Sequence, residues 1–148
     1  MRSIPVYNRK KSVRTWEKEG LIQIESFLED AVHFIILNLK VEKESKKIQE
    51  IKVNFFRSPY PELCPSSASP FEKIIGLTIA PGFNKKVSEL IPAEQGCTHI
   101  RSLLKEAADG FMQSFYYYTA GNLDGLERRK VLIKQLKNNC VAYSEKNV

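Results

Sequence analysis

A thiol and an imidazole stand two residues apart in the segment Gly96-Cys97-Thr98-His99. Residues 100–118 follow with few helix breakers and recurrent apolar side chains, which predicts a long helix that begins at Cys97. A cysteine in the first turn of a helix lies near the positive end of the helix dipole, which favours the thiolate over the thiol. Such a thiolate beside a histidine can be a metal ligand, a nucleophile or a redox group, and the residues alone leave all three open.

Two further residues could join this pair. Cys64 ends a proline-rich run, and Asp30 precedes a strongly β-forming segment. Thiolates and imidazole suit zinc or an iron–sulfur cluster, and one carboxylate can complete a tetrahedral set. A metal site of Asp30, Cys64, Cys97 and His99 is therefore expected if the fold brings the Cys64 loop beside the head of the long helix. The chain has no Cys-x-x-Cys pair, so spacing alone does not establish this site.

These residues favour an accessory protein that binds a metal or presents a reactive thiolate. Two alternatives to this function remain. In the first, the protein is a thiol-dependent enzyme in which Cys97 attacks an acyl or disulfide group and His99 is the base. In the second, the chain is a non-catalytic interaction module, and its cysteines are small buried hydrophobes. Cys140 is interpreted as structural or idle, and His33, inside an apolar strand, as a core or edge histidine.

Composition limits the other functions. The chain has 148 residues, 43% hydrophobic and 27% charged, which is typical of one globular domain. Its net charge is +6, but the basic residues stand in short separate groups, which favours a solvated surface over nucleic-acid binding. No apolar run reaches the roughly 20 residues of a membrane span, and the start lacks the apolar core of a signal peptide. With three cysteines and no disulfide framework, a cytoplasmic protein with reduced thiols is expected, and a protein partner stays open.

The pattern of elements predicts an α+β fold. Residues 1–20 are polar and basic and are expected to form an N-terminal arm that docks through Tyr7 and Trp16, followed by a single domain over residues 21–148. Alternating apolar residues predict a three-stranded antiparallel meander, and helices after it would pack on one face of the sheet. The predicted strands cover residues 21–28, 32–41 and 48–56, and the predicted helices cover residues 71–75, 84–90, 97–118 and 126–137.

The chain also resembles an uncharacterised bacterial family, domain of unknown function 2889, over roughly residues 9–143. The resemblance is carried by Asp30, a Pro-Tyr-Pro-x-x-Cys run ending at Cys64, the Gly96-Cys97-Thr98-His99 signature, and Cys140 with Tyr143. It implies family membership and no particular chemistry.

A looser resemblance is to the NifU-like scaffold proteins of iron–sulfur cluster assembly, also called NifU/IscU-like. These begin with a strand meander, and an aspartate and three cysteines surround their cluster or zinc. Asp30, Cys64 and Cys97 are similar to the aspartate and two of those cysteines, whereas Leu28 or Glu29 occupies the place of the first cysteine. The resemblance implies a related fold and a site for zinc or an iron–sulfur cluster.

Overall fold

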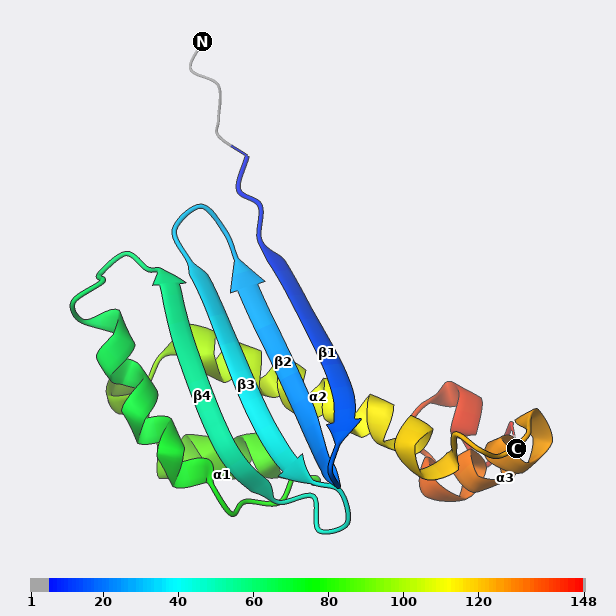
Figure 1. Cartoon of the computed structure of the whole chain (residues 1–148). Helices are drawn as coiled ribbons and strands as arrows, with labels where there is room; N and C mark the ends of the chain where they lie inside the picture. Colours follow the sequence, from blue (N-terminus) through cyan, green and yellow to red (C-terminus); the bar gives the residue numbers. More distant parts are fainter. Residues whose placement is uncertain (1–5, 148) are drawn as a thin grey trace. The chain divides into compact units, whose positions relative to one another are not determined.

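The computed structural model describes residues 6–147 and has an α+β architecture (Figure 1). Its sheet contains four antiparallel strands in the order β1-β2-β3-β4, so each strand pairs with its neighbours in sequence. The strands are β1 (Lys10–Lys18), β2 (Leu21–Glu29), β3 (Phe34–Glu42) and β4 (Ile48–Arg57).

The prediction of three strands was wrong, because the segment expected to be an arm contains β1. In this strand only Val13 and Thr15 are half-buried, so it lacks the alternating apolar pattern of its neighbours. It is held by backbone pairing to β2 through a two-residue turn at Glu19 and Gly20, whose φ angles are 55° and 77°. Two positive φ angles are typical of the tight turn that matches the twist of a hairpin. The division into an arm and a domain over residues 21–148 stays a prediction.

The core lies between the sheet and the helices. Every second side chain of β2 and β3 is buried, and paired strands place these residues opposite one another, as in Ile24 with Leu39 and Leu28 with Ile35. The face that meets them belongs to the long helix α2 (Thr98–Ala120). Its buried side chains recur at helical spacing and are Ile100, Leu103, Leu104, Ala107, Ala108 and Phe111.

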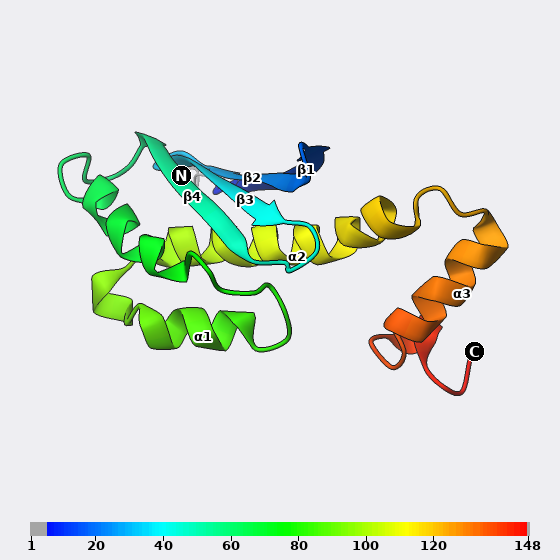
Figure 2. The ribbon, with the colours of Figure 1, turned by 60° about the horizontal axis from the view of Figure 1, so that its bottom comes forward.

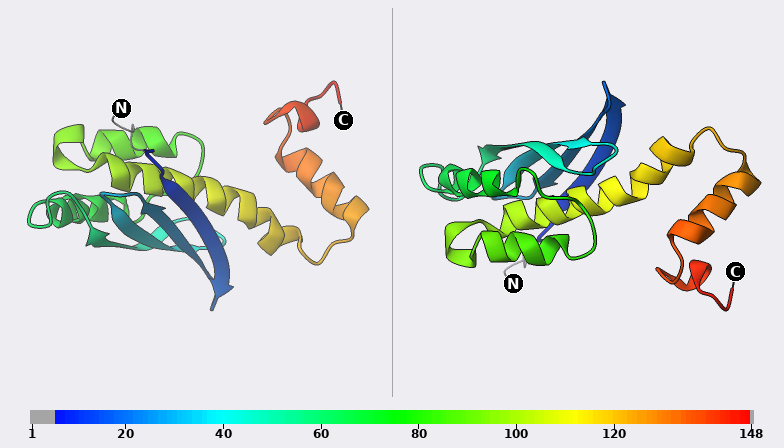
Figure 3. Two further views of the ribbon diagram at one scale, coloured as in Figure 1. Left: turned by 90° about the horizontal axis from the view of Figure 1, so that it is seen from above. Right: turned by 90° about the horizontal axis from the view of Figure 1, so that it is seen from below.

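The remaining elements of this part of the chain precede α2. A 3-10 helix, η1 (Cys64–Ile74), is longer than the short helix expected at residues 71–75 and begins at Cys64 itself. It is followed by α1 (Phe83–Leu90) and by a short 3-10 helix, η2 (Ala93–Gln95). Both α1 and α2 lie on one side of the sheet (Figure 2), which agrees with the predicted arrangement. Figure 3 shows α1 and α2 next to each other from above and from below.

By its internal contacts the chain forms two compact units, Met1–Met112 and Gln113–Val148. The second unit contains the last turns of α2, α3 (Gly125–Gln135) and a short 3-10 helix, η3 (Val141–Tyr143). Asp124 caps α3, because its side chain accepts from the backbone N–H groups of the first turn. Across residues 6–147, no helix has the length and apolarity needed to cross a membrane.

Candidate functional site

The turn between β2 and β3 places an aspartate and a histidine at one end of the sheet. The backbone N–H of Asp30 donates to the carbonyl oxygen of His33 (2.8 Å), which closes the turn. Oδ1 of Asp30 accepts from the backbone N–H groups of Val32 (2.8 Å) and His33 (2.7 Å). Short polar side chains commonly organise turns in this way. Arg57, at the end of β4, donates to the Asp30 carbonyl oxygen (2.6 Å) and ties the turn to the neighbouring strand.

The carboxylate of Asp30 is buried and fully engaged. Nε and Nη2 of Arg9 lie 3.0 and 2.8 Å from Oδ2, and the Tyr7 hydroxyl donates to the same oxygen (2.9 Å). Nδ1 of His33 lies 3.1 Å from Oδ1. Burial alone would raise the pKa of Asp30, but the two backbone N–H groups of the turn, with Arg9 and Tyr7, outweigh it and hold this pKa well below its usual range. The aspartate is therefore ionised at neutral pH.

His33 stacks on the histidine of the Gly-Cys-Thr-His segment. The ring centroids of His33 and His99 are 3.9 Å apart, with an angle of 34° between the ring planes. The His33 side chain is only 14% exposed. Because a carboxylate can only accept, we assign the proton on Nδ1 of His33 to its hydrogen bond with Asp30, which leaves Nε2 as the acceptor of the neutral ring.

The head of α2 brings the thiol to this pair. The carbonyl oxygen of Cys97 accepts from the backbone N–H of Arg101 (3.0 Å), so Cys97 occupies the cap position just before the helix. Its Sγ lies 3.9 Å from Nδ1 of His99, within reach of a hydrogen bond to sulfur. Two side chains that are two residues apart inside a helix point in different directions. Cys97 can contact His99 because it occupies the cap position, outside the regular helix.

The other ring nitrogen of His99 faces an arginine. Nη2 of Arg9 lies 3.3 Å from Nε2 of His99, and a guanidinium can only donate, so Nε2 is the acceptor. In the neutral ring the proton is then on Nδ1, directed at the sulfur of Cys97. Burial, and after it the charges of His33 and Arg9, lower the pKa of His99, with Asp30 opposing them. The imidazole of His99 is therefore neutral at pH 7 and acts as a donor toward Cys97.

We call these side chains the Cys97 cluster: Tyr7, Arg9, Asp30, His33, Cys97 and His99. Three of the four residues predicted for a site, Asp30, Cys97 and His99, belong to it. The fourth, Cys64, begins η1, where its backbone N–H donates to the Tyr60 carbonyl oxygen (2.8 Å). No contact described for Cys64 within residues 6–147 involves the cluster, and its participation stays a prediction. Cys140 is exposed in the second unit.

The cluster does not present a set of metal ligands. Among residues 6–147, no group of three or more His, Cys, Asp or Glu side chains could hold a metal ion. The contacts explain this finding, because Arg9 faces Nε2 of His99 and the oxygens of Asp30 accept from Arg9, Tyr7 and the turn. A cation beside the imidazole lone pair opposes a second cation there. The predicted zinc or iron–sulfur site is therefore unsupported by this arrangement.

Sequence reasoning missed His33 and Arg9. His33 is predicted to be a core or edge histidine, and it is hydrogen-bonded to Asp30, but its ring also lies against the ring of His99. The spacing Asp30-x-x-His33 next to a strand end was the available signal, because it is typical of an aspartate-organised turn. Arg9 gave no such signal, since it stands among other basic residues and pairs with Asp30 only after β1 is placed.

Comparison with known proteins gives one family match. A model of the family described as "Protein of unknown function (DUF2889)" matches residues 7–113, more than two thirds of the chain. The matched region contains the whole Cys97 cluster and ends at the boundary between the two compact units. No curated protein and no solved structure gives a significant match, so the resemblance to NifU-like scaffolds stays a prediction.

Proposed function

The chain belongs to the DUF2889 family, whose description assigns no function, and from the contacts of its own site we propose that it is a thiol-dependent protein with Cys97 as the reactive nucleophile. The observation that carries this proposal is the 3.9 Å approach of His99 Nδ1 to Cys97 Sγ, with Arg9 on the opposite ring nitrogen.

The cluster works as a series of positioning contacts. Asp30 is fixed by its turn and holds Arg9 through two nitrogens. Arg9 in turn holds the His99 tautomer that carries a proton on Nδ1. A donor at this place stabilises a negative sulfur, and so does the start of α2. In this proposal His99 is a donor to the thiolate, which differs from the expected role as its base.

The chemistry that such a thiolate performs is nucleophilic substitution. The sulfur lone pair would attack an acyl carbon or a disulfide sulfur, and the bond from that atom to its leaving group would break with its electron pair. His33 adds a hydrogen-bond acceptor to this site. Asp30 fixes the proton on Nδ1 of its imidazole, which leaves Nε2 as the acceptor.

Single-cysteine proteins test the proposal directly. Cys64→Ser with Cys140→Ser leaves Cys97, and Cys64→Ser with Cys97→Ser leaves the exposed Cys140 as the matched control. We expect Cys97 to react with iodoacetamide at pH 7 at about ten times the rate of Cys140, although Cys97 is less exposed. His99→Leu in the first protein removes the donor and should bring the rate of Cys97 down to that of the control.

The opposite result is equally clear. A Cys97 that reacts more slowly than Cys140 between pH 6 and 8, and whose rate His99→Leu leaves unchanged, would show that Cys97 is an ordinary half-buried thiol. Circular dichroism of each variant establishes that the fold is retained when the rates are compared.

A further inference from the structure

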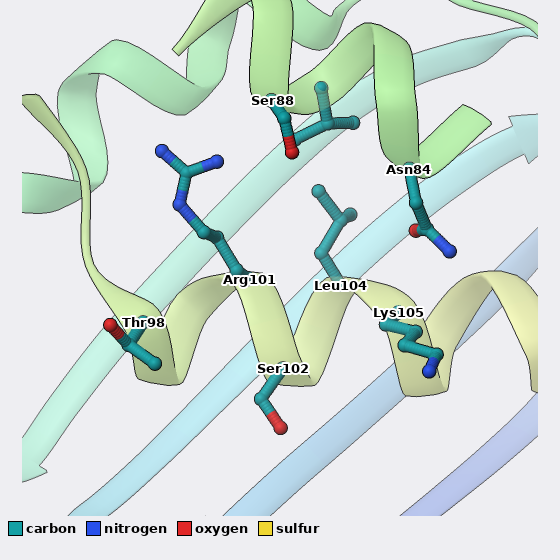
Figure 4. Close-up of a pocket in the computed structure, with 8 residues that line it drawn as sticks. Asn84, Ser88, Thr98, Arg101, Ser102, Leu104 and Lys105 are labelled. Carbon is teal, nitrogen blue, oxygen red and sulfur yellow. The ribbon is translucent and has the colours of Figure 1, made fainter. Parts of the chain in front are cut away.

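A groove of about 440 Å³ lies between α1 and the first turns of α2 (Figure 4). This volume is within the range of small-molecule sites. Six of its eight lining residues carry polar side chains, and none of the eight is a carboxylate. The lining residues are Asn84, Val87, Ser88, Thr98, Arg101, Ser102, Leu104 and Lys105.

Arg101 is held in place before any ligand arrives. Its Nη2 donates to the carbonyl oxygen of Ile91, and its guanidinium lies over the ring of Phe71, 5.8 Å from the centroid. A guanidinium has five N–H donors, so this anchoring leaves others available to a ligand. A cation that is already fixed loses little conformational entropy on binding, which favours affinity.

Gly96 provides the space that this arginine occupies. Its φ of −121° is accessible to any residue, so backbone conformation does not require glycine here. A Cβ at this position would instead lie 3.0 Å from Nη2 of Arg101 and 3.1 Å from Cγ2 of Ile91. A Cβ at the glycine of the Gly-Cys-Thr-His segment would therefore crowd the guanidinium in the groove.

The rest of the rim adds positive charge and donors. Lys105 is exposed at the edge of the groove. Oγ of Ser102 is directed away from α1 (Figure 4) and accepts from Nζ of Lys11 (2.6 Å), a residue of β1 that does not line the groove. Ser88 points its hydroxyl into the space between the two helices (Figure 4). Cations with hydroxyl and amide donors, and no acidic lining residue, select an anion.

We propose that this groove binds a small molecule that carries a phosphate group. A phosphate uses several donors at once and is doubly charged near neutral pH, which matches a groove with an arginine, a lysine and the Ser88 hydroxyl. The groove volume leaves room for an organic part beside the phosphate. The inference does not depend on the reactivity of Cys97, because the thiol is not among the lining residues.

Glucose 6-phosphate, inorganic phosphate and glucose are suitable probes at constant ionic strength. Binding is measured by calorimetry, and its place by the backbone amide NMR signals of residues 98–105. We expect both phosphates to bind and to shift these signals, and glucose to do neither. Lys105→Gln should raise the Kd of glucose 6-phosphate about tenfold, because it removes one charge-assisted hydrogen bond. Ser88→Phe fills the groove from an exposed position and should abolish binding.

Lys52→Gln is the matched control, since it removes an exposed lysine on β4, away from the groove. It should change the Kd less than twofold. Equal losses in Lys105→Gln and Lys52→Gln would show attraction to the overall positive charge and overturn the proposal. Failure of both phosphates to bind, or equal binding of glucose and glucose 6-phosphate, would also overturn it.

Discussion

The imidazole rings of His33 and His99 are stacked with their centroids 3.9 Å apart, although one belongs to the β2–β3 turn and the other to the first turn of α2. Asp30 accepts from one ring, and Arg9 donates to the other. The two rings therefore have different hydrogen-bond partners in spite of their contact, and the contact joins the sheet end to the head of the helix.

The first prediction concerns the titration of His99. Burial and the charges of His33 and Arg9 lower its pKa, so its NMR titration should have a midpoint below the ordinary value of about 6.5. Arg9→Gln removes one of these charges and should move the midpoint upward. Arg14→Gln, which breaks a surface pair with Glu25, is the control and should leave the midpoint unchanged. A midpoint that Arg9→Gln does not move would contradict the proposed contact.

The same shift makes stability depend on pH in a defined direction. Because the pKa of His99 is lower in the folded chain, the unfolded chain binds more protons as pH falls below about 6.5. The free energy of unfolding contributed by His99 is thus present above that pH and is lost below it. His99→Gln should flatten this part of the stability profile, measured by urea unfolding at pH 5, 6, 7 and 8.

A second prediction concerns the buried carboxylate. Asp30→Asn keeps the shape but removes the charge that pairs with Arg9, and should lower the free energy of unfolding by about 2 kcal/mol at pH 7. Since the pKa of Asp30 is depressed on folding, its contribution is present above about pH 4 and is lost at lower pH as the carboxylate becomes protonated. The difference between the two proteins should therefore shrink in acid. Glu25→Gln, in a surface pair, should cost less than about 1 kcal/mol.

A third prediction concerns the close packing of β1 on α2. A Cβ at Gly110 would lie 2.8 and 2.9 Å from the two methyl carbons of Val13. Alanine normally gains about 1 kcal/mol over glycine inside a helix, but here the clash should make Gly110→Ala destabilising by about 1 kcal/mol. Adding Val13→Ala relieves the clash, so the double variant should be more stable than Gly110→Ala alone. Urea unfolding decides, and a single variant more stable than the parent protein would refute the close contact.

A fourth prediction uses a polar atom in the core. The hydroxyl of Ser26 is fully buried on β2 and has no hydrogen-bond partner among residues 6–147. Ser26→Ala removes a hydroxyl that has lost its hydration without gaining a hydrogen bond. The substitution should therefore raise the free energy of unfolding by about 1 kcal/mol. Ser12→Ala, at an exposed position on β1, should change it by less than about 0.5 kcal/mol. A destabilised Ser26→Ala protein would mean that the hydroxyl is in fact satisfied.

Much of the fold could be predicted from hydrophobic periodicity. The strands at residues 21–28, 32–41 and 48–56 were found within two residues of their ends, because the side chains of one face are buried in β2 and β3 and mostly half-buried in β4. The long helix was found for the same reason, from its apolar stripe. β1 was missed because its side chains are mostly exposed, so that backbone pairing rather than burial defines it.

The candidate site was predictable only in part. Cys97 and His99 could be recognised because neighbouring residues at a helix start form a local pattern. Arg9 links them to Asp30, and this link depends on where β1 contacts α2. That contact joins segments far apart in the chain and cannot be predicted from local sequence. The role of Gly96 was equally hidden, since its φ angle is ordinary and the close approach of the Arg101 and Ile91 side chains explains it.

The start of α2 contributes residues to both surfaces, with Cys97 and His99 on the thiol side and Thr98 and Arg101 on the groove side. Where the occupancy of one surface changes the equilibrium at the other, the linkage is reciprocal. If an anion in the groove shifts the equilibrium between free and modified sulfur, modification of the sulfur must shift the affinity for the anion by the same factor. A protein built in this way could report the occupancy of one surface through the state of the other.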